Sequence, residues 1–115
     1  MYNVNINNVG VDRVGEKLHL FGKLEWTNDE DDSLIKVSFD NFPCNLVADT
    51  LNLLERLPFN RDELIEIPGL YIRYEGLERE TFKKAIRQLF AIAVASTPSE
   101  LVDVTLNFKE EWEEE

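Results

Sequence analysis

Residues 18–40, LHLFGKLEWTNDEDDSLIKVSFD, decide the fold because apolar and polar side chains alternate on both sides of an acidic stretch. An alternation of period two is typical of a β-strand that buries one face. Before the acidic stretch, one face of the chain carries Leu18, Leu20, Gly22, Leu24 and Trp26. After it, one face carries Ile35, Val37 and Phe39. The segment therefore predicts two strands joined by a hairpin whose tip is NDEDD.

The N-terminal residues alternate in the same way. Tyr2, Val4 and Ile6 form an apolar face, and three asparagines form the opposite face. We therefore expect a first half-buried strand, followed by a loop or a bulged connection over residues 10–16, GVDRVGE. Three successive strands with polar outer faces predict an antiparallel meander.

A first helix is predicted over residues 43–57. Asn41 is suited to cap it, Pro43 suits a first helical turn, and apolar residues then recur with helical spacing. Strand composition returns over residues 64–74. Within that segment Pro68-Gly69 predicts either a tight hairpin or a bend between two short strands. The bend is an alternative because proline at this position favours a type II turn, whose twist opposes that of the flanking strands.

A second helix is predicted over residues 77–95. Its core stripe consists of Phe82, Ala85, Ile86, Leu89, Phe90 and Ala93. Its last residues are apolar all round, so we expect that end to be buried on several sides. Apolar residues then alternate over residues 102–108, which predicts a final strand.

The predicted order is three strands, a helix, one or two strands, a helix and a last strand. This order is typical of an α+β domain in which a mostly antiparallel sheet packs against two helices. A chain of 115 residues with 43 % hydrophobic residues is sufficient for one core, so residues 1–115 are predicted to form a single domain. Residues 109–115 are expected to fray as an acidic tail.

The net charge of −11 is concentrated in two places. Asp29 to Asp32 contribute four negative charges, and Glu110 to Glu115 contribute five. This charge disfavours direct binding to nucleic acid or to an anionic membrane, and it favours a basic protein partner. The longest apolar run is too short to span a membrane, and the single cysteine cannot form an internal disulfide, so we expect a cytoplasmic protein. Cys44 is interpreted as a small buried residue near a helix start.

The common catalytic and metal-binding patterns are missing from the sequence. The NDEDD segment lacks the glycine and the glutamate that a calcium loop needs at its sixth and twelfth positions. One histidine and one cysteine cannot supply the usual ligands of zinc, and His19 falls on the polar face of its strand. Nucleophile-elbow and phosphate-cradling motifs do not occur. We therefore expect no enzyme activity, catalytic residue, cofactor or metal.

The second helix carries a local excess of basic residues. Arg79, Lys83 and Arg87 share one side of it at helical spacing. They form either a solvated face or a small patch for an anion or an acidic partner.

The two acidic runs are the candidate partner-binding surface. If the last strand continued into the tail, alternate glutamates would lie about 6.6 Å apart, a spacing similar to that of successive phosphates. Trp112 among them suits an interface anchor, although it also suits a core position at the sheet edge. The candidate partner-binding residues are Asp29, Glu30, Asp31, Asp32, Glu110, Glu111, Trp112 and Glu113.

The sequence thus predicts a small non-enzymatic protein-binding module with an acidic surface that imitates nucleic acid. An inhibitor, immunity protein or anti-defence protein acting on a basic, nucleic-acid-binding or nuclease-like partner fits this description. Two alternatives remain. One is an acidic homodimeric chaperone or adaptor that binds a client segment at a sheet edge, and the other is a small-molecule-binding domain or minor enzyme.

Overall fold

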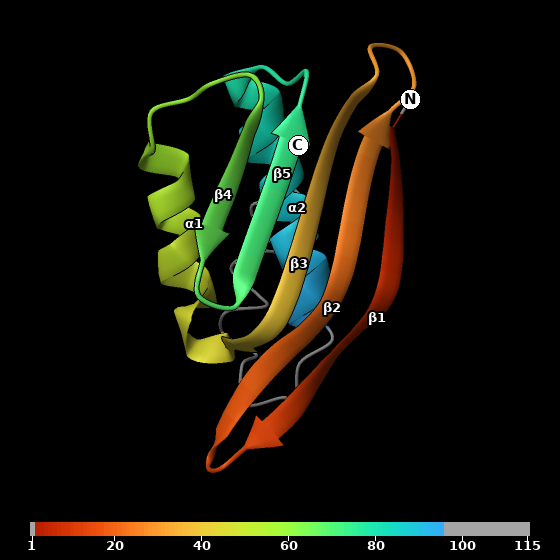
Figure 1. The fold of residues 1–115 in the computed structure, drawn as a ribbon. Helices are drawn as coiled ribbons and strands as arrows, with labels where there is room; N and C mark the ends of the chain where they lie inside the picture. Colours follow the sequence, from red (N-terminus) through yellow and green to blue (C-terminus); the bar gives the residue numbers. More distant parts are fainter. Residues whose placement is uncertain (1, 96–115) are drawn as a thin grey trace.

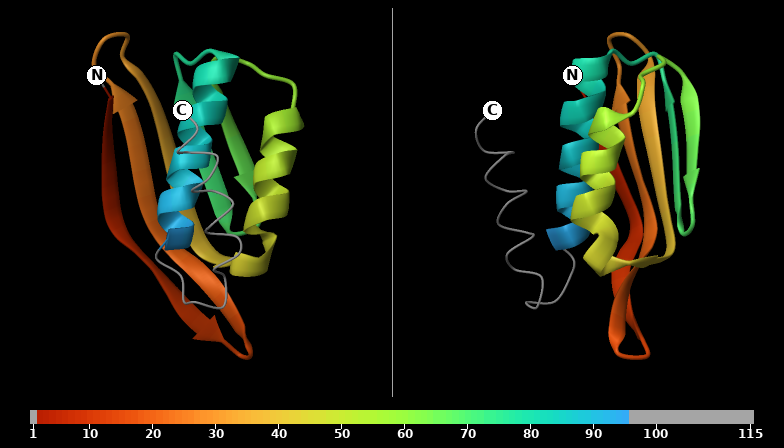
Figure 2. Two further views of the ribbon diagram at one scale, coloured as in Figure 1. Left: turned by 180° about the vertical axis from the view of Figure 1, so that it is seen from behind. Right: turned by 90° about the vertical axis from the view of Figure 1, so that its left-hand side faces the viewer.

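An antiparallel sheet of five strands is the framework of the structure (Figure 1), and the computed structural model describes residues 2–95. The strands are β1 (Tyr2–Val14), β2 (Lys17–Asn28), β3 (Ser33–Pro43), β4 (Glu63–Ile67) and β5 (Leu70–Glu75), in the spatial order β1-β2-β3-β5-β4. Two helices, α1 (Val47–Arg56) and α2 (Arg79–Ala95), lie against one face of the sheet (Figure 2). The predicted α+β class is confirmed, whereas the predicted strand over residues 102–108 and the tail at 109–115 lie outside the described residues.

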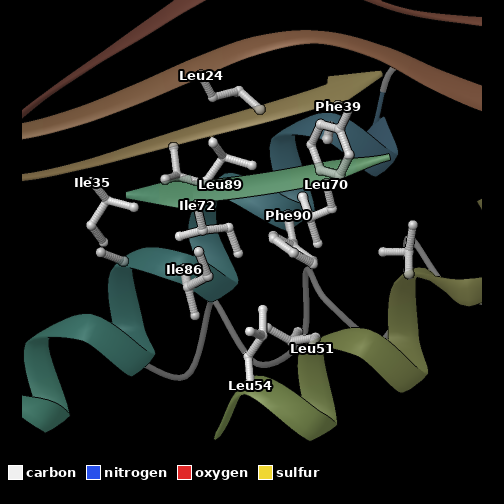
Figure 3. Close-up of a cluster of buried hydrophobic side chains, with 14 of the residues drawn as sticks. Leu24, Ile35, Phe39, Leu51, Leu54, Leu70, Ile72, Ile86, Leu89 and Phe90 are labelled. Carbon is white, nitrogen blue, oxygen red and sulfur yellow. The ribbon is translucent and has the colours of Figure 1, made fainter. Parts of the chain in front are cut away.

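The hydrophobic core lies between the helices and the sheet. Figure 3 shows side chains from both layers pointing toward one another: Leu24, Ile35, Phe39, Leu70 and Ile72 from the sheet, and Leu51, Leu54, Ile86, Leu89 and Phe90 from the helices. Every residue of the predicted core stripe of α2 is buried. The alternation of β2 is confirmed as well, since Leu20, Leu24 and Trp26 all face the core.

The first strand is longer than the sequence indicated. The segment predicted as a loop or bulged connection is largely part of β1, which pairs with β2 as far as Val14. A bulge interrupts the pairing between Asn7 and Gly10, and Gly22 of β2 lies opposite it. A Cβ atom on Gly22 would lie 2.5 Å from the Cα of Val9, and Gly22 has φ +118°. The bulge therefore requires glycine at this position.

The end of β3 corrects the predicted helix start. Strand pairing continues to Pro43, and Asn41 is the extra residue of a bulge opposite β2, with φ 61°. Its side-chain oxygen accepts a hydrogen bond of 2.6 Å from Nδ1 of His19 and caps no helix. A short 3-10 turn (Cys44–Leu46) follows, and α1 begins only at Val47. Asn41, which was predicted to cap the helix, is therefore part of the bulge in β3 instead.

The Pro68-Gly69 pair closes a hairpin rather than a bend. Ile67 and Leu70 are paired across β4 and β5, and Gly69 adopts φ +80°, the value that the third residue of a type II turn needs. The carbonyl of Gly69 accepts a hydrogen bond of 2.9 Å from the backbone N–H of Asp40. This contact to β3 holds the turn even though its twist does not match that of the strands.

The bulge opposite Gly22 gives a direct test of the fold. We expect Gly22→Ala to lower the free energy of unfolding by at least about 2 kcal/mol, because the new methyl group meets backbone that cannot move aside. Gly10→Ala is the matched control, since a Cβ there meets nothing within 4 Å, and its cost should stay within about 0.5 kcal/mol. Urea denaturation of both variants measures the difference, and equal midpoints would contradict the assigned bulge.

Candidate functional site

The acidic stretch forms the tip of the β2–β3 hairpin, as the sequence predicted. Asn28 and Ser33 are the last paired residues, and Asp29, Glu30, Asp31 and Asp32 are all exposed in the turn between them. The backbone N–H of Glu30 donates a hydrogen bond of 3.0 Å to the side-chain oxygen of Asn28. Side-chain oxygens of Asn and Asp commonly hold tight turns in this way. The four carboxylates are thus presented on a locally fixed loop.

Asp31 has a structural role in addition to its charge. The hydroxyl and the backbone N–H of Ser33 both donate to Asp31 Oδ1, at 2.6 and 3.1 Å. These hydrogen bonds lower the pKa of the Asp31 carboxyl below its usual 3.8, and the bond from the Ser33 hydroxyl has the larger effect. Ionised Asp31 therefore stabilises the folded loop above the unfolded-state pKa, and this contribution is lost as the pH falls through the folded-state pKa.

Two other connections meet the acidic loop at the same end of the sheet, the upper end in Figure 1. Gly76 follows β5 and lies over the loop's base, because a Cβ added to it would be 3.4 Å from the Cα of Ser33. The N–H of Gly76 donates a hydrogen bond of 2.6 Å to Asp62 Oδ1 from the α1–β4 connection. Arg61 donates from Nη2 to the carbonyl of Gly76 at 3.3 Å, and its charge attracts Asp31.

This convergence defines a surface that we call the acidic end: Asp29, Glu30, Asp31, Asp32, Asp62 and Glu78. All six residues are exposed. Sequence reasoning found the first four and missed Asp62 and Glu78, which are far from them along the chain. The fold alone brings them together, and no local sequence signal marks the contact. Arg61 lies among them as a bridging cation, held by its backbone and side-chain contacts to the β5–α2 connection.

An aromatic cluster supports the α1–β4 side of the acidic end. Phe59 stacks on Tyr74 with ring centroids 5.6 Å apart, and Phe82 of α2 contacts both rings. The hydroxyl of Tyr74 donates to Glu63 Oε2 at 2.9 Å. Burial, together with this carboxylate, raises the pKa of the Tyr74 hydroxyl well above its usual value. The segment that carries Asp62 is therefore anchored to the core.

The other predicted partner-binding residues belong to the C-terminal run. Glu110, Glu111, Trp112 and Glu113 lie outside the described residues, so their role in partner binding stays a prediction. The described part of the candidate surface is the acidic end alone.

The basic residues of α2 have a partner within the fold. Arg87 donates from Nε and Nη2 to the two carboxylate oxygens of Glu55 in α1, both at 2.8 Å. Arg79 donates from Nη2 to the backbone carbonyl of Glu55 at 3.2 Å. The side chain of Glu55 is only 11 % exposed. The interpretation as an anion patch is therefore corrected for Arg87, which is partly buried in an ion pair that connects the two helices. Arg79 is exposed, in agreement with a solvated face, and it also contacts α1.

Chemistry at the remaining candidate residues is limited by their surroundings. Within residues 2–95, no group of three or more His, Cys, Asp or Glu side chains is arranged to hold a metal ion. Cys44 is buried, as predicted, and burial raises the pKa of its thiol. Among the helices of this described range, none has the length and apolar character needed to cross a membrane.

Comparison with known proteins returned no match to a family model, to a curated protein or to a solved structure.

The hydrogen bonds of Asp31 predict a measurable titration. We expect its NMR titration midpoint to lie below 3.8 and to rise in Ser33→Ala, because the hydroxyl that favours the ionised form is removed. Ser38→Ala, which removes a hydroxyl from the middle of β3, is the control and should leave the midpoint of Asp31 unchanged. A midpoint that stays the same in Ser33→Ala would contradict the assigned contact.

The link between α1 and α2 predicts a loss of stability in Glu55→Gln. We expect the free energy of unfolding to fall by about 1 kcal/mol, because the amide cannot accept both hydrogen bonds from Arg87. Glu16→Gln, in the exposed β1–β2 turn, makes the same chemical change and should have little effect. Thermal or urea denaturation of the two variants makes the comparison, and an equal loss in both would argue against the link.

Proposed function

We propose that this protein is a non-enzymatic protein-binding module that docks its acidic end on the basic surface of a partner protein. The observation that supports the proposal is the convergence of six exposed carboxylates from three connections at one end of the sheet. Proteins that bind or cleave nucleic acid have basic working surfaces, which an acidic surface can cover. An inhibitor, immunity or anti-defence role is the corresponding biological class.

The construction of the acidic end suits recognition. The loop is shaped by contacts from Asn28 and Asp31, so few of its backbone conformations are lost on binding. Its charges remain exposed and can attract a basic surface from a distance, which speeds association and repels anionic competitors. The aromatic cluster anchors the segment that carries Asp62, which holds this residue at the same end of the sheet as the loop.

A second candidate function, a chaperone or adaptor, is favoured by a different feature. β1 is an outer strand of the sheet, and on the helix-facing side Tyr2 and Ile6 are 44 % and 57 % exposed. An outer strand with free backbone groups and apolar side chains can accept a further strand from a client or from a second copy of the chain. Here the acidic residues would supply solubility rather than recognition.

Charge neutralisation at the acidic end, compared with the same change at three positions elsewhere, separates the two candidates. The test variant carries Asp29→Asn, Glu30→Gln and Asp32→Asn, and it keeps Asp31 because that residue shapes the loop. The control variant carries Asp12→Asn, Glu16→Gln and Asp49→Asn, three exposed positions away from the acidic end. Both variants change the net charge equally.

We expect a basic protein captured by the full chain at low salt to bind the test variant about tenfold more weakly, since three exposed charges contribute roughly 0.5 kcal/mol each. The loss should appear mainly in the association rate and should shrink at high salt. The control variant should bind like the unmodified chain. Surface plasmon resonance with the purified partner measures both rates, and equal affinities of the two variants would refute the acidic end as the docking surface.

A further inference from the structure

The face of the sheet opposite the helices carries a polar surface that the proposed function does not use. Within residues 2–95, α1 and α2 both cover the other face (Figure 2). Strand pairing aligns two rows of side chains across this open face. One row is Asn5, Glu25, Lys36 and Arg73, and the other is Asn7, Lys23, Ser38 and Tyr71.

A cavity of about 360 Å³ lies along the β1, β2 and β3 part of these rows. Its polar lining comes from three neighbouring strands: Asn5 and Asn7 of β1, Lys23 and Glu25 of β2, and Lys36 and Ser38 of β3. The volume falls within the range of about 300 to 1,000 Å³ that is typical of ligand sites. Asn5 and Ser38, which lie 33 positions apart in the sequence, thus share one concave surface.

The positive charges at this cavity are only partly neutralised. Lys36 lies opposite Arg73 across β3 and β5, and like charges in such a pair repel. Lys36 has Glu25 at 3.7 Å and Arg73 has Glu75 at 3.2 Å as acidic neighbours. The Lys23 side chain has no hydrogen-bond or ion-pair partner among residues 2–95. A chain of net charge −11 therefore holds, at the edge of a cavity, an ammonium group without a partner among residues 2–95, beside a second lysine that is paired with Glu25.

The asparagines of β1 supply further polar groups at the cavity. Asparagine has a low preference for strands, yet it occupies three alternating positions of β1, two of which line the cavity. The side chains of Asn5 and Asn7 are exposed, and neither makes a side-chain hydrogen bond within residues 2–95. A side-chain amide offers both donors and an acceptor, which is the complement of a peptide group.

We propose that this cavity binds an acidic peptide segment. A carboxylate of the segment pairs with Lys23 and Lys36, and Asn5 and Asn7 hydrogen-bond the peptide groups beside it. A polyanion such as nucleic acid does not fit, because the positive patch is small and the rest of the chain repels phosphates. The site is separate from the acidic end and has the opposite charge preference.

The direct test is a titration of the ¹⁵N-labelled full chain with a short end-blocked peptide that contains three consecutive glutamates. We expect the side-chain amide signals of Asn5 and Asn7 to shift and saturate, and the same peptide with three glutamines to shift them at least tenfold more weakly. N-acetylglutamate should also bind more weakly than the glutamate peptide, since it lacks the neighbouring peptide groups. Equal binding of all three ligands, or unmoved Asn5 and Asn7 signals, would overturn the proposal.

Two lysines of the same strand provide the matched variants. Lys23→Gln should weaken binding of the glutamate peptide about tenfold. Lys17→Gln makes the same charge change at the far end of β2, outside the cavity, and should leave the affinity unchanged. Equal weakening in both variants would mean general charge attraction and would overturn the site. The variant with a neutralised acidic loop should still bind the peptide, so failure of either proposal is distinguishable from failure of the other.

Discussion

The packing of α2 against the sheet is the interaction on which the rest of the structure depends. Ile86, Leu89 and Phe90 are almost fully buried, and they face side chains of the central strands and of α1 (Figure 3). Phe82 is also buried, and its ring contacts that of Tyr74 in β5. Burial of each such side chain contributes roughly 1.5 to 3 kcal/mol before the entropy of ordering is counted. Because α2 starts directly after the β5–α2 connection, its position also fixes Gly76 over the acidic loop. The arrangement of the acidic end is thus a consequence of the core.

Periodicity correctly predicted the strands and the helix in which the apolar pattern runs without interruption. The alternation of β2 and β3 and the apolar stripe of α2 were sufficient, since burial on one face is a local property of the sequence. The extent of β1 was missed because a bulge shifts the alternation after Asn7. The helix start was wrong for the same kind of reason. Asn41 is of a residue type that often caps helices, but the long-range pairing of β3 with β2 keeps it in the strand.

The candidate site could be predicted only in its local part. The hairpin tip at Asp29 to Asp32 follows from sequence, whereas its association with Asp62 runs through Gly76, which contacts Asp62 and the distant Ser33. The pairing of Arg87 with Glu55 is equally non-local, and it neutralises one cation on the side of α2 that helical spacing assigned to solvent. Charge counts along a chain therefore describe the charge of a face only after the fold is known.

The bulge opposite Gly22 also limits how another strand can pair with the free edge of the sheet at β1. It divides the thirteen residues of β1 into two shorter ladders, and the divided strand bends where Asn8 adopts φ 57°. A bent outer strand cannot offer an unbroken row of backbone groups to another chain, which discourages edge-to-edge pairing of sheets into aggregates. Any strand added at this edge is confined to one of the two ladders. A single glycine thereby sets the maximum length of segment that the edge can recognise.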